Sequence, residues 1–223
     1  MKKKIELFMA FLLLIGAIVA SKKLSEFVED VSSKQLKKDE VLIVIDPGHG
    51  GEDPGKVGVN GALEKELNLK IADKLKKLLE EKNIQIVMTR EDDFVPESKK
   101  EDLQKRVDLI NEVKPEIVIC IHQNSFTDQT VAGSQVFYHG SSEISKQIAQ
   151  MLQEELWLVD EEHQRQIKGN ENYYMLSETE VPTVIVECGF LSNAADEEKL
   201  KTEEYQDQIA HAICTGITKW LDK

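Results

Sequence analysis

The sequence predicts a single three-layer αβα domain, built on a mixed, mostly parallel central sheet. Residues 41–45, Val-Leu-Ile-Val-Ile, form an unbroken β-favouring run that is typical of a strand buried on both faces. From there to residue 223, similar apolar runs alternate with amphipathic segments, which is the pattern of a sheet covered by helices. A chain of 223 residues can bury such a core without disulfide bonds.

The first 21 residues predict an export signal. Three lysines at positions 2–4 precede an apolar run over 7–20. The run is shorter than the ~20 residues that span a bilayer comfortably, so a signal peptide is favoured and a retained membrane anchor is the open alternative. Residues 22–40, with five lysines and five acids, predict a linker. We therefore expect residues 41–223 to form an extracytoplasmic domain that meets the membrane only through the N-terminal segment.

The spacing of apolar residues places the helices. Asn83 can end the first helix in a left-handed conformation, and Pro115 prevents the second from continuing. Helices are predicted over residues 64–82, 98–113, 144–156 and 205–220.

Apolar β-favouring runs place the remaining strands. The polar residues 159–172 lack periodicity, so we expect there a loop that is long enough to lie near a site. Strands are predicted over residues 84–88, 116–121, 134–138 and 183–190, with a short edge strand over 173–176.

Composition argues against a nucleic-acid partner and against a disulfide framework. A net charge of -13 leaves no excess of basic residues to neutralise phosphates. The three cysteines, Cys120, Cys188 and Cys214, are odd in number and each lies in an apolar segment, so we expect buried thiols. Cys188 should face the core if Glu187 faces a site, because successive strand residues point to opposite faces.

Chemistry-bearing side chains lie at the ends of three predicted strands. His49 lies in the Gly- and Pro-rich turn after the first strand, His122 follows the strand over 116–121, and Glu187 lies late in the strand over 183–190. If these strands run parallel, the three side chains meet at one edge of the sheet. Two imidazoles and one carboxylate, with a position left for water, form the ligand set of hydrolytic zinc sites. Glu64 and Glu187 are both candidates for the carboxylate, and turn or supporting roles for the histidines stay open.

A set of segments spaced along the chain carries a family pattern: Ile45-Asp46-Pro47-Gly48-His49-Gly50-Gly51, Glu64-Lys65, Thr89-Arg90, Leu103 with Arg106 and Asn111, Ile121-His122-Gln123-Asn124-Ser125, and residues 186–193, Val-Glu-Cys-Gly-Phe-Leu-Ser-Asn. This set resembles the zinc-dependent N-acetylmuramoyl-L-alanine amidases. The resemblance runs from Val41 to the end of the chain and implies a hydrolase of peptidoglycan, located outside the cytoplasm and either secreted or membrane-anchored. The reaction would cut the amide between the lactyl group of N-acetylmuramic acid and the L-alanine of the stem peptide.

The resemblance also implies roles for individual residues. His49, Glu64 and His122 would be the ligands of a Zn²⁺ ion, with Glu187 as the catalytic acid and base. Glu66 is the rival of Glu64, two residues further along the helix. We expect Asp46 and Arg90 to hold the loop that carries His49 through hydrogen bonds and ion pairing. We expect His139, His163 and His211 to be surface or helix residues.

Finer features resemble the sporulation-associated branch of the family, which strips stem peptides so that muramic δ-lactam can form in spore cortex. The segments concerned are residues 121–126, 134–138 and 172–176. Candidates for substrate contacts are Asn124, Arg165, Asn172 and Tyr174, with an ordinary solvated loop as the alternative for the loop residues.

Two other functions stay open at this point. One is a different zinc peptidase of the wall, and the other is a non-catalytic or partner-dependent peptidoglycan-binding regulator. No repeated wall-binding module flanks the domain, so we expect targeting through the N-terminal segment and consider an activating protein partner.

Overall fold

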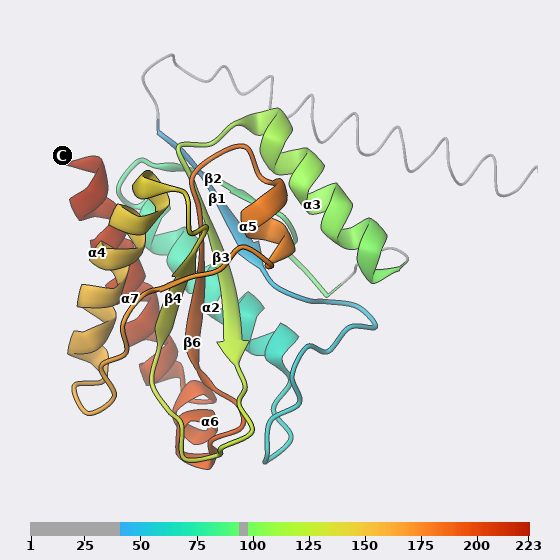
Figure 1. Cartoon of the computed structure of the whole chain (residues 1–223), viewed down its shortest axis with the longest axis vertical. Coiled ribbons are helices and arrows are strands. Elements are labelled where there is room, and N and C mark those ends of the chain that lie inside the picture. Colours follow the sequence, from blue (N-terminus) through green and yellow to red (C-terminus); the bar gives the residue numbers. More distant parts are fainter. Residues whose placement is uncertain (1–40, 94–97) are drawn as a thin grey trace, which may run out of the picture. The chain divides into compact units, whose positions relative to one another are not determined.

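A six-stranded mixed sheet forms the centre of the computed structural model (Figure 1), which describes residues 41–93 and 98–223. The predicted signal or anchor over residues 1–21 and the linker over 22–40 lie outside the described residues. The strand order is β2-β1-β3-β6-β4-β5. The strands are β1 (Leu42–Pro47), β2 (Gln85–Met88), β3 (Ile117–Asn124), β4 (Gln135–Tyr138), β5 (Lys168–Gly169) and β6 (Thr183–Phe190).

The sheet is mostly parallel, as predicted. β1 runs parallel to β2 and β3, and β3 runs parallel to β6, whereas β4 is antiparallel to β6. The parallel strands β1, β3 and β6 bring their carboxyl ends to one edge of the sheet, which is where the chemistry-bearing residues were expected.

Helices cover both faces of the sheet, which confirms the three-layer architecture (Figure 1). The apolar stripes of α2, α4 and α7 pack on one face and on each other, and form the main core with alternate residues of the strands. α3 and α5 pack together over the other face. The helices are α2 (Glu64–Glu80), α3 (Lys99–Val113), α4 (Glu143–Val159), α5 (Tyr174–Glu178), α6 (Ala194–Leu200) and α7 (Glu203–Leu221). Among the described residues, no helix is both long and apolar enough to cross a bilayer.

Local signals explain where the helices begin and end. Ser98 and Glu101 form a capping box at the start of α3, which satisfies backbone N–H groups of the first turn. Asn83, just beyond α2, has a φ of 61°, so the predicted left-handed termination is confirmed. Lys114 adopts a φ of 47° between α3 and Pro115.

Three details of the predicted elements differ from the structure. The edge strand predicted over residues 173–176 is wrong, because Met175 and Leu176 turn inward as part of the short helix α5 and the edge strand is β5. β3 continues to Asn124, so His122 lies within the strand and not after it. α6 was not predicted, because seven residues are too few to show a helical period.

Candidate active site

The turn that carries His49 is held by two buried guanidinium groups. Nε of Arg90 donates to the carbonyl oxygen of Pro47 at 2.9 Å, and Nη2 of Arg106 donates to that of His49 at 2.8 Å. Arg106 also pairs with the buried carboxylate of Asp46 at 2.8 Å. Asp46 and Arg90 therefore hold the loop, as expected. This support maintains His49 in a left-handed conformation, with a φ of 63°, that residues other than glycine rarely adopt.

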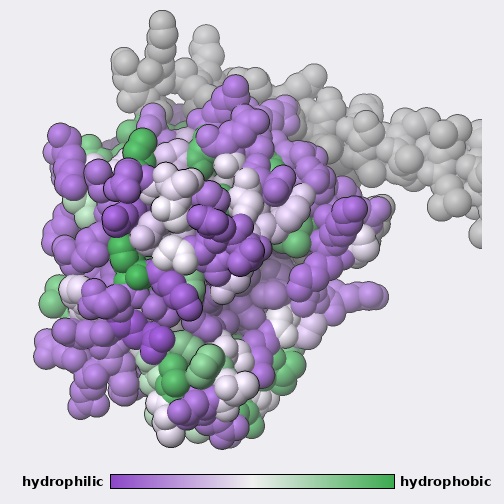
Figure 2. Space-filling model, viewed as in Figure 1, coloured by the Kyte–Doolittle hydropathy of each residue, from purple (hydrophilic) through white to green (hydrophobic). Residues whose placement is uncertain are grey.

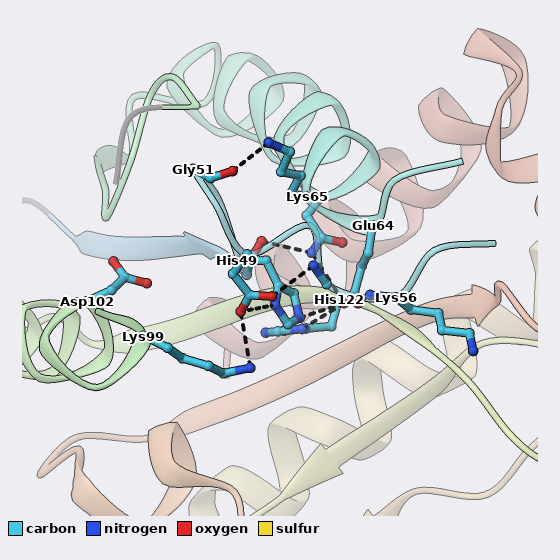
Figure 3. Close-up of polar contacts among 12 residues, drawn as sticks. His49, Gly51, Lys56, Glu64, Lys65, Lys99, Asp102 and His122 are labelled. Atoms are coloured by element: carbon cyan, nitrogen blue, oxygen red, sulfur yellow. Dashed lines mark hydrogen bonds and ion pairs between the residues drawn. The ribbon is translucent and has the colours of Figure 1, made fainter. Parts of the chain in front are cut away.

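His49, Glu64 and His122 point toward one another from three separate elements (Figure 3). Glu64 is the first residue of α2, and His122 comes from β3. Oε1 of Glu64 lies 3.2 Å from Nε2 of His49 and 3.0 Å from Nδ1 of His122. One ligand atom from each residue falls within 4.8 Å of the others, so the three can hold one metal ion. Glu66 is exposed on α2 and is not part of this cluster.

Other groups orient the side chains of His49 and Glu64. Nδ1 of His49 lies 2.9 Å from Oδ2 of Asp53, which leaves Nε2 directed at the cluster. The backbone N–H of Lys56 donates to Oε2 of Glu64 at 2.7 Å, and that of Gln123 donates to Oε1 at 3.0 Å. Carboxylates and backbone groups commonly fix metal ligands in this way.

The protonation states of the cluster are tightly linked. Burial would raise the pKa of Glu64, but hydrogen bonds from His122 and His49 outweigh it and hold this pKa well below its ordinary value. Burial would lower the pKa of His122, but its hydrogen bond to Glu64 and the carboxylate charge raise it overall. An ionised Glu64 between two imidazoles is a donor set that suits Zn²⁺.

Gly48 is required by the close approach of His122. A Cβ at position 48 would overlap the imidazole ring of His122. The amide side chain of Asn68 donates to the carbonyl oxygen of Gly48 at 3.0 Å, and the N–H of Gly48 donates to Ile121. The glycine therefore lets the turn after β1 pack directly against the ring on β3.

Glu187 lies on β6 beside this cluster. It is opposite His122 in the parallel pairing of β6 with β3, and only 7% of it is exposed. Its Oε2 has no hydrogen-bond partner among the described residues. Burial raises the pKa of Glu187 from 4.5 to about 7. A carboxyl group with such a pKa can both accept and donate a proton near neutral pH. Its neighbour Cys188 is fully buried in the core, as expected.

A pocket of about 400 Å³ contains the three clustered residues and Glu187. Its walls include Lys99, Leu103 and Arg106 of α3, together with the segment over 173–175. Figure 2, drawn from the same side as Figure 1, shows that hydrophilic residues dominate this face of the domain. The three clustered residues and Glu187 therefore line one shared pocket in a domain whose surface is largely hydrophilic on this face.

The four predicted substrate-contact residues occupy different places. Asn124 and Tyr174 line the pocket, whereas Arg165 and Asn172 do not. The guanidinium of Arg165 stacks 5.0 Å from the ring centre of Phe190, and its Nε donates to Oε1 of Gln135 at 3.2 Å. The sequence reasoning missed Asp53, Lys56 and Tyr173, which also line the pocket or support it. For Asp53, the sequence offered one signal of this role, which was its position four residues after His49.

The profile of the N-acetylmuramoyl-L-alanine amidases matches residues 43–219 of the chain, over the site just described. The chain belongs to this family. The germination-specific N-acetylmuramoyl-L-alanine amidase of Bacillus subtilis is 36% identical over 189 residues, covering 81% of this chain and 79% of the relative. The amidase LytC of the same organism is 33% identical over 215 residues, covering 91% of this chain and 42% of LytC.

Solved amidases share the fold. The CwlD amidase of Clostridioides difficile, whose structure was determined in complex with the GerS lipoprotein, has a TM-score of 0.79 and 35% identity. The match covers 82% of this chain and 99% of CwlD. The catalytic domain of CwlV from Paenibacillus polymyxa has a TM-score of 0.74 and 33% identity, covering 82% of this chain and 98% of that domain. This chain is thus an amidase of the peptidoglycan-hydrolysing family, and the predicted enzyme class is confirmed.

Proposed function

We propose that this amidase works with a Zn²⁺ ion held by His49, Glu64 and His122, and with Glu187 as its acid and base. The observation that carries this proposal is the position of Glu187. A buried carboxyl group with a free oxygen shares one pocket with three residues that together can hold a metal ion. The bond cut is the amide between N-acetylmuramic acid and the L-alanine of the stem peptide.

The chemistry of an amide requires these groups. When bound, zinc supplies Lewis acidity for the scissile carbonyl and for the attacking water. Glu187 in its ionised form takes a proton from that water, and the resulting carboxylic acid gives it to the departing amine nitrogen. A pKa of about 7 keeps both forms populated near neutral pH. Asp53 and the N–H of Lys56 keep His49 and Glu64 oriented.

The alternatives receive less support. A regulator without catalytic activity could lose any of the four residues, but His49, Glu64, His122 and Glu187 all converge in one pocket. A different wall peptidase is disfavoured by the match of the amidase profile across residues 43–219.

Substrate contacts follow from the positions of the candidate residues. Asn124 and Tyr174 line the pocket, so we infer that they contact the glycan or stem peptide beside the scissile amide. Gln135 pairs with Glu187 across β4 and β6, which puts Gln135 and its partner Arg165 on the same face of the sheet as Glu187. Arg165 is therefore the candidate for a more distant carboxylate of the stem peptide. A substrate contact by Asn172 stays a prediction.

The biological role that we propose is the removal of stem peptides in spore cortex. Support comes from the germination-specific relative of Bacillus subtilis and from the structural likeness to CwlD. CwlD was solved with a lipoprotein, so we also propose a protein partner for this chain. Amidases of the cell wall act outside the cytoplasm, and we propose secretion or membrane anchoring through residues 1–21.

Mass spectrometry of digested peptidoglycan tests this function. Cortex-type and vegetative peptidoglycan are incubated with the zinc-loaded protein, with the same protein after chelator treatment, and with chelated protein to which zinc is restored. We expect new free L-alanine amino termini that vanish with chelator and return with zinc. Cleavage at another bond would support the peptidase alternative, and cleavage that withstands full metal removal would contradict the zinc site.

A further inference from the structure

We propose that Glu197 is a positioning residue, which fixes the metal ligand Glu64 through the loop of residues 56–62. This inference rests on the proposed function, since it concerns the same metal site. Glu197 lies on α6, and the loop precedes α2; both lie at the same end of the domain (Figure 1). They are more than 130 residues apart in sequence.

Glu197 anchors the tip of this loop by two backbone hydrogen bonds. The N–H of Asn60 donates to its Oε2 at 2.6 Å, and the N–H of Ala62 donates to its Oε1 at 2.9 Å. Glu197 is completely buried. Burying a carboxylate is costly unless it is well hydrogen-bonded, and bonds to an ionised acceptor are stronger than neutral ones. A side chain in this situation holds its donors firmly in place.

The loop is shaped to receive this carboxylate. A Cβ on Gly58 would overlap the carboxylate of Glu197, so the loop can approach α6 only with glycine at this position. The N–H of Gly58 donates to the carbonyl oxygen of Ala62 at 2.8 Å, which closes the loop on itself. The N–H of Val59 reaches the carbonyl oxygen of Leu191, just before α6.

Backbone contacts connect the anchored tip of the loop to Glu64. Val57 and Leu63 form an antiparallel bridge at its base. Below that bridge, the N–H of Glu64 donates to the carbonyl oxygen of Lys56 at 3.1 Å, and the N–H of Lys56 donates to Oε2 of Glu64 at 2.7 Å. Anchoring the tip thus fixes the N–H group that orients the ligand carboxylate. Glu197 acts on the metal site without being part of it.

Zinc affinity of the full chain tests this inference. Glu197→Gln keeps the shape of the side chain but turns an amide NH₂ toward one of the two backbone N–H groups. Loss of groups that orient metal ligands typically weakens metal binding 10–100-fold, so we expect the zinc Kd to increase by about tenfold or more. The Kd is measured by competition with a chelator. Melting of the metal-free protein is measured alongside it.

The neighbouring Glu198 provides a matched control. Glu198 is exposed, accepts a hydrogen bond from the side chain of Asn60 at 3.3 Å, and pairs with Lys201. Glu198→Gln removes the same charge one residue away without touching the backbone of the loop. We expect its zinc Kd to stay within about twofold of the parent value, since exposed ion pairs contribute little.

A second variant keeps the test decisive if Glu197→Gln fails to fold. Gly58→Ala forces the loop and Glu197 apart from the opposite side, so we expect it to weaken zinc binding as well. In the double variant the two losses should be less than additive, because both break one contact. The inference would be overturned if the folded variants bound zinc with a Kd within twofold of the parent value while only their melting temperature was lowered. A parent protein that binds no zinc would instead contradict the proposed function, and this inference with it.

Discussion

Glu187 and His122 lie directly opposite each other in the parallel pairing of β6 with β3. Opposing residues of adjacent strands project to the same face of a sheet, so this register places the carboxyl group beside the histidine without any loop in between. The proposed acid and base is thereby positioned by two hydrogen-bonded strands of the central sheet. The buried surroundings that raise its pKa come from the same sheet.

The raised pKa of Glu187 predicts a pH-dependent stability effect in the metal-free protein. Its pKa is about 7 in the folded chain and near 4.5 when unfolded. Between these values the unfolded chain releases the proton while the folded chain keeps it, so the folded state loses relative stability as the pH rises through this range. Glu187→Gln removes the titration. We expect this variant to gain up to about 3 kcal/mol relative to the parent between pH 4 and pH 8.

Urea unfolding of both metal-free proteins at the two pH values checks this prediction. Comparing parent and variant at each pH cancels the titration of acids that do not interact with Glu187. A difference in unfolding free energy that is the same at pH 4 and pH 8 would show that Glu187 ionises normally.

The distinction between Glu64 and Glu66 predicts opposite outcomes for two similar substitutions. Glu64 is 4% exposed and touches both histidines, whereas Glu66, in the same first turn of α2, is exposed. We expect Glu64→Gln to weaken zinc binding by more than about 100-fold, which exceeds the loss typical of an orienting group. Glu66→Gln should leave the zinc Kd unchanged. Equal Kd values for the two variants in chelator competition would remove Glu64 from the ligand set.

Zinc affinity should decrease as the solution becomes more acidic. Burial lowers the pKa of His122, but the hydrogen bond and charge of Glu64 raise it above its ordinary value. Zinc requires the neutral ring, so protons compete with the ion as the pH falls through this raised pKa. From pH 7.5 to pH 5.5 we expect the zinc Kd to increase at least about tenfold. Isothermal titration at several pH values measures this, and a constant Kd would contradict it.

Gly48→Ala should abolish metal binding for a steric reason. The added Cβ would overlap the ring of His122, which must then leave its position. Gly140→Ala is the control, since Gly140 does not line the pocket and the atoms nearest to its Cβ position belong to the side chain of Glu171, with Oε1 at 3.2 Å. There we expect a small change in stability and intact zinc binding, because the end of this side chain can move aside. Metal analysis after gel filtration compares the two variants, and stoichiometric zinc in Gly48→Ala would show that the turn can move away.

The sheet and the clustered residues could be predicted because their signals are local. Apolar runs marked β1, β3 and β6, and the residues His49 and His122 occupy the ends of such runs. Parallel strands then bring these ends together whatever the details of the loops. The sequence therefore predicted that His49, His122 and Glu187 converge, whereas the place of Glu64 in the cluster was implied by the resemblance to the family.

The surroundings of the site could not be predicted, because they depend on backbone without periodicity. The contacts of Asp53, Lys56 and Glu197 arise from how residues 50–63 fold back on α2 and α6. Residues 173–176 are rich in aromatic and apolar side chains that favour strands, but packing against α3 and β6 makes them part of a helix. Short elements of this kind are determined by tertiary contacts rather than by propensity.

The hydrolysis rate of zinc-loaded Glu187→Gln tests the central claim most directly. The substitution preserves the shape of the side chain and leaves His49, Glu64 and His122 intact. The account predicts that the variant holds as much zinc as the parent and releases L-alanine amino termini from peptidoglycan about 10²- to 10⁴-fold more slowly. A zinc-loaded variant that works within about threefold of the parent rate would contradict the account, because general acid and base catalysis by Glu187 would then be absent.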